Sequence, residues 1–318
     1  MTAHEPLPDA KLDNWVDRFA PRRLRPWLKL GRFDRPTGIW LLMLPGWQGV
    51  ALAGAMAGHP PDPALLLKIF LGACLMRAAG CAYNDIVDRD MDAKVARTAG
   101  RPLPSGQITV LQGWIFTGLC ALLSLTILLS LNGLAIGLGV GSLGLVAAYP
   151  FMKRITWWPQ AWLGLTFNWG SLLGFAAATG TLGWPVALLY ASGIFWTLGY
   201  DTIYAVQDLE DDALAGIKSS ALRLGTSAPR AVLTFYILAF VMALASGWMA
   251  RLGPLFLPLA AGFGLHLSRQ AAGLKLEDPA GALGAFKSNT LAGSLLLLAI
   301  MAGLWGHGWG AVALPPSP

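Results

Sequence analysis

Charged residues are scarce in this 318-residue chain: Asp, Glu, Lys and Arg make up 13% of it, while hydrophobic residues make up 55%. A soluble domain normally carries about a quarter charged residues, so the composition excludes an ordinary water-soluble domain. The mean hydropathy of +0.55 agrees with this exclusion. The net charge of +6 does not indicate a nucleic-acid partner, because the basic residues are spread over several loops and form no single soluble basic face.

Cysteine and histidine are also few. Cys74, Cys81 and Cys120 show no Cys-x-x-Cys spacing, which argues against a disulfide framework or a cysteine metal site. His266 lies within a long apolar segment. There we expect it to make a hydrogen bond to a neighbouring helix and not to act as a ligand.

Long apolar runs are what the chain does have, and runs of about 17 to 25 residues can cross a bilayer as helices. We predict an all-α polytopic membrane protein with about nine transmembrane helices, centred on 38–57, 64–86, 112–131, 133–149, 162–180, 184–206, 230–250, 254–271 and 289–308. Within the fourth run, the spacing of Gly133, Gly137 and Gly141 predicts close helix packing.

The chain is predicted to have three parts: an N-terminal segment 1–36, a nine-helix domain 37–310 and a tail 311–318. In the first part, Leu12, Trp15, Val16 and Phe19 recur at helical spacing, which predicts an amphipathic helix at the membrane surface. The first 35 residues contain no apolar core of a signal peptide, so we expect no cleavage there. Basic residues precede the first run and recur in alternate loops, which predicts a cytoplasmic N-terminus and an external C-terminus.

Acidic residues gather at the end of the second run, in the stretch "YNDIVDRDMDAKVARTAGRPLPSG". Asp85, Asp88 and Asp92 share one face of a helix, and carboxylates beside a membrane need a compensating cation. The pattern recurs 120 residues later, because Asn84, Asp88 and Asp92 correspond to Tyr204, Asp208 and Asp212, with Asp201 two turns before. The repeat predicts a duplicated unit that serves one site.

Carboxylates without accompanying His or Cys suit a hard cation such as Mg²⁺, which also binds phosphate oxygens. Basic residues lie near the acidic clusters in the sequence, and guanidinium and ammonium groups bind phosphate. They are Arg97, Arg101, Lys153, Arg154, Lys218 and Arg223. The predicted ligand is therefore a diphosphate carried by a membrane-soluble molecule.

These motifs resemble those of the UbiA intramembrane aromatic prenyltransferases. "MRAAGCAYNDIVDRDMDAKVARTAGRPLPSG" is similar to the family's first motif, Asn-Asp-x-x-Asp-x-x-x-Asp, and "DTIYAVQDLEDD" is similar to its second. "RFDRPTGIWLLMLP" and "YPFMKRITWWPQ" resemble segments of the branch that acts on 4-hydroxybenzoate. The likeness extends from about residue 32 to residue 290.

The resemblance implies nine helices around a central cavity, bound Mg²⁺, and transfer of a polyprenyl group from polyprenyl diphosphate to 4-hydroxybenzoate in ubiquinone biosynthesis. It implies an inner membrane, bacterial or mitochondrial, and no obligate protein partner. The expected metal ligands are Asn84, Asp88, Asp92, Asp208 and Asp212. The expected catalytic residues are Asp85, Asp201 and Arg77, and the expected substrate-binding residues are Arg97, Arg101, Tyr149, Lys153, Arg154, Tyr204 and Lys218.

Two alternatives stay open at this point. The acidic motifs concern only the donor, so the acceptor could be dihydroxynaphthoate, homogentisate, haem or a chlorophyllide. A cation-coupled transporter is the alternative from another class, although transporter acids commonly lie near the bilayer midplane and these clusters fall at helix ends.

Overall fold

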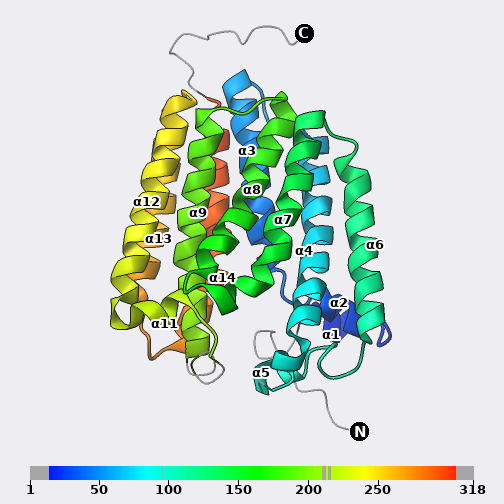
Figure 1. Ribbon diagram of the computed structural model, residues 1–318. Coiled ribbons are helices and arrows are strands. Elements are labelled where there is room, and N and C mark those ends of the chain that lie inside the picture. The colour runs from blue at the N-terminus through cyan, green and yellow to red at the C-terminus, as the bar shows by residue number, and fades with distance from the viewer. Residues whose placement is uncertain (1–13, 95, 210–212, 214–215, 306–318) are drawn as a thin grey trace. The chain divides into compact units, whose positions relative to one another are not determined.

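The computed structural model describes residues 14–94, 96–209, 213 and 216–305, and every regular element in these ranges is a helix (Figure 1). The all-α prediction is therefore confirmed for the described chain. The long helices are α3 (Thr37–Ala57), α4 (Pro63–Asp92), α6 (Val110–Leu128), α7 (Gly133–Ile155), α8 (Pro159–Thr179), α9 (Trp184–Ala205), α12 (Ala228–Met249), α13 (Phe256–Gly273) and α15 (Asn289–Ala302). Each of the predicted apolar segments overlaps one of them. The short elements are α1 (Trp15–Phe19), α2 (Arg25–Leu30), α5 (Ala96–Ala99), η1 (Val206–Asp208), α11 (Ser220–Leu224), η2 (Gly225–Ser227) and α14 (Pro279–Lys287).

Within the described residues, six helical stretches are long and apolar enough to cross a membrane: Thr37–Ala57, Pro63–Asp92, Val110–Leu128, Gly133–Ile155, Ser220–Met249 and Pro279–Ala302. The chain is therefore an integral membrane protein. Helices α8, α9 and α13 do not reach the same hydropathy. They carry polar side chains that are hydrogen-bonded inside the protein; on α8, for example, Asn168 Nδ2 donates to Thr197 Oγ1 of α9 at 2.7 Å.

The chain packs as two compact units, and each unit consists of two separate stretches of the sequence. The first is Met1–Trp40 with Phe70–Ser130, and the second is Leu41–Ile69 with Leu131–Pro318. Helices α3 and α4 each contribute residues to both units. The predicted bounds of the three parts, 1–36, 37–310 and 311–318, stay predictions.

The core of the first unit lies between α4, α6 and the N-terminal segment. Leu30, Ala82 and Leu103 are buried together in one cluster, and Phe116 of α6 packs against this cluster and against a second one built on Ala78. The predicted amphipathic helix is represented by α1, which is five residues long, with Val16 buried and Phe19 exposed. Leu12 lies outside the described residues.

The second unit is built around α9, which packs against α8 and α12 (Figure 1). The ring of Trp196 on α9 meets the rings of Tyr200 and Phe263 edge-on, at centroid distances of 5.4 and 6.1 Å. Burial of such aromatic rings supplies much of the packing free energy of a core. After Trp184, every residue of α9 is buried or partly buried.

Close packing through glycine occurs between α3 and α8. A Cβ atom at Gly49 would overlap the carbonyl oxygen of Ser171, and one at Gly174 would overlap the carbonyl oxygen of Gly46. At Gly133 and Gly137 a Cβ atom would meet no described atom within 4 Å, and at Gly141 only the ring of Trp169 at 3.9 Å. The prediction of close packing along α7 was wrong for the described chain, because glycine spacing does not reveal whether a partner helix lies opposite.

The prediction for His266 is confirmed. Its Nε2 atom lies 3.1 Å from Ser288 Oγ, and Gln270 Nε2 lies 3.1 Å from the same ring nitrogen. Gln270 also accepts a hydrogen bond from Tyr236 Oη at 2.7 Å and one from Asn289 Nδ2 at 3.2 Å. These contacts connect α12, α13 and α15 through buried polar groups.

The contrast between α3 and α7 gives a matched test. Gly49→Ala should lower the stability of the protein by about 1 to 3 kcal/mol, because the added methyl group must displace backbone. Gly137→Ala should leave stability unchanged or raise it slightly, because alanine favours a helix interior and meets open space. Thermal unfolding in detergent would measure both, and equal midpoints for the two variants would contradict the packing.

Candidate functional site

The C-terminal half of α4 presents one acidic face to the interior of the first unit. Asp85, Asp88 and Asp92 have exposed fractions of 0%, 1% and 8%. On the opposite side, Arg89 and Asp90 are exposed and pair with each other at 2.8 Å. The helical face predicted from the spacing of the three acids is confirmed, and the intervening charges project away from it.

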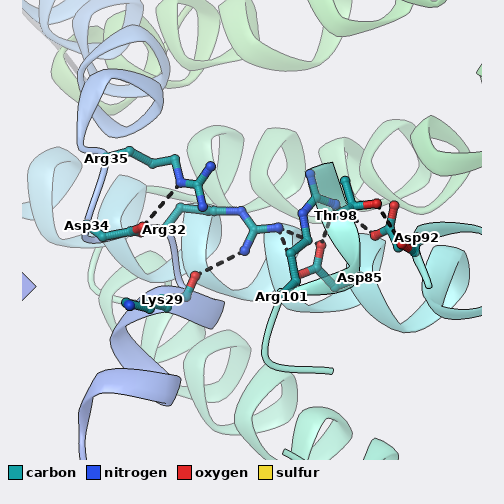
Figure 2. A network of polar contacts seen from close by, with 8 residues as sticks. All are labelled: Lys29, Arg32, Asp34, Arg35, Asp85, Asp92, Thr98 and Arg101. Atoms are coloured by element: carbon teal, nitrogen blue, oxygen red, sulfur yellow. Dashed lines mark hydrogen bonds and ion pairs between the residues drawn. The ribbon is translucent and has the colours of Figure 1, made fainter. Parts of the chain in front are cut away.

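Asp85 is held by Arg32 from the segment after α2 (Figure 2). Arg32 Nη2 donates to both carboxylate oxygens of Asp85, at 2.6 and 2.8 Å, and Arg32 Nη1 donates to the carbonyl oxygen of Lys29 at 3.0 Å. Burial acts to lower the pKa of Arg32, but the adjacent Asp85 carboxylate, together with smaller contributions that include Asp34, raises that pKa overall. The Arg32 guanidinium therefore keeps its charge throughout the accessible pH range.

Arg101 connects Asp85 to Asp92. Its Nη1 atom lies 3.3 Å from Asp85 Oδ1 and 2.8 Å from Asp92 Oδ2 (Figure 2). Thr98 Oγ1 donates to the carbonyl oxygen of Asp92 at 2.7 Å and so holds the end of α4 to the segment that carries Arg101. Two guanidinium groups thus balance two carboxylates, as buried charges require.

The backbone of Arg32 adopts a left-handed conformation, with φ of 61°. This conformation is uncommon for residues other than glycine and costs free energy. The hydrogen bonds from its guanidinium to Lys29 O and to Asp85 compensate for this cost. Arg32 was not among the predicted site residues, because basic residues before a first apolar run indicate membrane topology and carry no sign of a distant acidic partner.

Asp34 and Arg35 form a second charged pair in the same unit. Asp34 is buried, and Nε of Arg35 lies 3.4 Å from Asp34 Oδ2 (Figure 2). The guanidinium of Arg77 on α4 lies directly against Gly38 in the first turn of α3. Arg77, one of the predicted catalytic residues, lies on α4 seven residues before Asn84, which is about two helical turns.

Two of the predicted site residues are not fully described. Arg97 belongs to the short helix α5, but its side chain lies outside the described residues, and Asp212 lies outside them altogether. Within the described ranges, no three His, Cys, Asp or Glu side chains are grouped closely enough to hold a metal ion. At Asp85 and Asp92, the carboxylate oxygens contact guanidinium groups instead.

The second acidic motif begins on α9, in the second unit. Asp201 and Tyr204 lie in the last turns of that helix, and the ring of Tyr204 lies 4.6 Å from the ring of Phe286. Helix α9 ends at Ala205, and Asp208 is buried in the 3-10 turn η1 that follows. Helix α9 therefore ends between Asp201 and Asp208, and the prediction that these two acids share one face stays a prediction.

The remaining predicted residues lie near the end of α7. Tyr149 packs on the core of the second unit, and Arg154 is exposed, with its guanidinium 5.9 Å from the ring centre of Phe151. The backbone N–H of Lys218 donates a hydrogen bond to Lys153 O at 3.0 Å, and its ammonium group donates one to Ile155 O at 3.2 Å. A cation at the last carbonyl groups of a helix is stabilised by the helix dipole, so Lys218 caps α7.

Comparisons with known proteins agree with this organisation. A model of the UbiA prenyltransferase family matches residues 42–291. The chain is 45% identical over 289 residues to the human mitochondrial 4-hydroxybenzoate polyprenyltransferase, covering 90% of this chain and 77% of the human protein. It is 44% identical over 292 residues to the protein of the same name from Arabidopsis thaliana, covering 91% and 71%.

Solved structures share the fold. A UbiA homologue from Aeropyrum pernix K1 superposes with a TM-score of 0.70 at 25% identity, covering 81% of this chain and 96% of that one. A UbiA homologue from Archaeoglobus fulgidus, solved with GPP and Mg²⁺, superposes with a TM-score of 0.64 at 18% identity, covering 88% and 99%. The fold and the acidic motifs define a polytopic membrane enzyme of the prenyltransferase class. This chain belongs to the UbiA prenyltransferase family.

The Arg32–Asp85 pair predicts an asymmetric response to substitution. Arg32→Met should destabilise the protein by about 3 kcal/mol, because the buried Asp85 carboxylate would keep only the longer contact to Arg101, at 3.3 Å. The double variant Arg32→Met/Asp85→Leu should recover part of that loss, because it removes the uncompensated charge as well.

The control is Arg89→Met, which removes an exposed partner from the same helix and should change stability little. Thermal unfolding midpoints in detergent would compare the four proteins. A midpoint for the double variant lower than that for Arg32→Met alone would show that Asp85 does not depend on Arg32.

Proposed function

We propose that this protein transfers a polyprenyl group from polyprenyl diphosphate to the ring of 4-hydroxybenzoate, ortho to the hydroxyl group, and releases diphosphate. The product class places the reaction in ubiquinone biosynthesis. The observation that carries the proposal is the retention of both acidic motifs in a chain 45% identical to a named 4-hydroxybenzoate polyprenyltransferase over 90% of its length.

The residues of the two motifs fit Mg²⁺. Asn84, Asp88 and Asp92 recur at four-residue intervals on α4 and offer only oxygen ligands, and buried Asp208 of the second unit does the same. Hard oxygen ligands are those that Mg²⁺ prefers. We assign Asn84, Asp88 and Asp92 to one ion and Asp208 with Asp212 to another. Bound Mg²⁺ would neutralise the negative charge that develops on the departing diphosphate.

The basic residues of the chain supply further charge for the diphosphate. Arg101 already lies beside Asp85 and Asp92, so its guanidinium is close to the end of the motif that would receive the diphosphate. Lys153 and Tyr149, near the end of α7, are the second group that we assign to the donor. Lys218 holds the end of α7 through Ile155 O and in this way positions Lys153.

The reaction breaks the bond between the allylic carbon and the diphosphate oxygen and forms a carbon–carbon bond to the ring. The ring carbon then loses its proton to a base. Asp85 is poorly suited to this step, because the guanidinium of Arg32 occupies both of its carboxylate oxygens. We therefore assign Asp85 to holding Arg32 and Arg101, and the proton to Asp201 or to the departing diphosphate.

The membrane topology belongs to the same proposal. Nine crossings, with α8, α9 and α13 spanning beside the six more apolar stretches, would place the N-terminus in the cytoplasm or mitochondrial matrix and the C-terminus outside. The basic residues before α3 and in alternate loops support this orientation. Both acidic motifs would then lie on the side where soluble 4-hydroxybenzoate is present.

An acceptor panel tests the activity. Purified protein with Mg²⁺ and a long-chain polyprenyl diphosphate should release diphosphate and yield a prenylated product with 4-hydroxybenzoate, as determined by mass. Turnover only with dihydroxynaphthoate, homogentisate, haem or a chlorophyllide would reassign the acceptor. Cation flux without any isoprenoid diphosphate would favour a transporter.

Substitution of the motif acids tests the assignment of the metal ligands. Asp88→Ala and Asp208→Ala should each lower turnover by about a thousandfold or more, because each removes a ligand on which the leaving group depends. Asp90→Ala, an exposed acid on the same helix, is the control and should keep normal turnover. Normal rates in either motif variant at saturating Mg²⁺ would refute the assignment.

A further inference from the structure

Gly38 lies where no other residue would fit without moving Arg77. A Cβ atom at Gly38 would stand 2.6 Å from Arg77 Nη2, 2.8 Å from Nε and 2.9 Å from Cζ. Three atoms of one guanidinium group therefore lie on the bare Cα of the second residue of α3. Gly38 is not among the residues with positive φ, so the position requires the absence of a side chain and not the conformational freedom of glycine.

The backbone around Gly38 is fixed more firmly than the guanidinium. Phe33 and Leu75 pack against the buried cluster of Ala78 and Ala79, the two α4 residues that follow Arg77. In the first turn of α3, Pro36 O accepts hydrogen bonds from Ile39 N at 2.8 Å and from Trp40 N at 3.1 Å. An added methyl group at Gly38 would consequently displace the end of the Arg77 side chain and leave the helices in place.

Arg77 stands about two turns before Asn84 on α4 and so on the face that carries the first motif. We propose that Gly38 is a positioning residue. Because it has no side chain, the Arg77 guanidinium can lie directly against α3, and this placement orients the guanidinium to hold an anionic group of one substrate. A guanidinium binds carboxylate or phosphate through hydrogen bonds of fixed geometry. Its orientation therefore matters as much as its charge. This inference rests on the proposed function.

The test is a double-mutant cycle between Gly38→Ala and Arg77→Ala. Gly38→Ala alone should lower kcat/KM by roughly 10- to 100-fold, the range for losing one charge-assisted hydrogen bond. The loss should appear as a raised KM for one of the two anionic substrates, with the KM for the other unchanged. In the Arg77→Ala background, Gly38→Ala should change kcat/KM by less than about twofold, because the group it displaces is gone.

Gly72→Ala is the matched control, since Gly72 also lies in a helix of this unit and a Cβ atom there would meet no described atom within 4 Å. Its kinetics should equal those of the wild type. Normal kinetics for Gly38→Ala, equal rises in both KM values, or losses that multiply in the double variant would each overturn the inference.

Thermal unfolding midpoints provide a readout without substrate. If Gly38→Ala lowers the midpoint, adding Arg77→Ala should restore it, and a failure to restore it would show that Gly38 serves the helix and not Arg77. An inactive wild type would refute the proposed function, and the unfolding cycle would still measure the contact.

Discussion

A carboxylate inside an apolar protein is stable only when a cation lies against it, and the first unit is arranged around that requirement at Asp85. Arg32 precedes α4 in the sequence and Arg101 follows it, and both contact this one side chain. The left-handed backbone at Arg32 and the bond from Thr98 to the end of α4 both serve to bring the two guanidinium groups there. The end of α4 is consequently ordered by charge pairing as well as by apolar packing.

The same pairing joins two acids of the first motif in one network. Asp85 accepts hydrogen bonds on both oxygens from Arg32, and Arg101 contacts both Asp85 and Asp92. These buried carboxylates are therefore compensated by cations of the protein itself. Their spacing along α4 predicts the shared face but does not show that one guanidinium contacts both acids.

Periodicity and composition predicted the helical fold, the acidic face of α4 and the hydrogen bond of His266, because each depends on spacing or burial within one segment. They did not predict the partner of Asp85, since Arg32 is 53 residues away and sequence spacing carries no information about that contact. The glycines of α7 were misjudged for a related reason. Whether another helix lies close to a given face is decided by tertiary packing.

The buried polar network of the second unit bears on how the chain is made. Gln270 on α13 makes hydrogen bonds to Tyr236 of α12, Ala285 of α14 and Asn289 of α15. Helices α14 and α15 are synthesised after α13. In lipid, an unsatisfied amide costs several kcal/mol, so α13 gains its full stability only after the C-terminal helix has emerged from the ribosome. Truncation before α15 would thus impair the retention of α13 during biogenesis, although α13 itself would be complete.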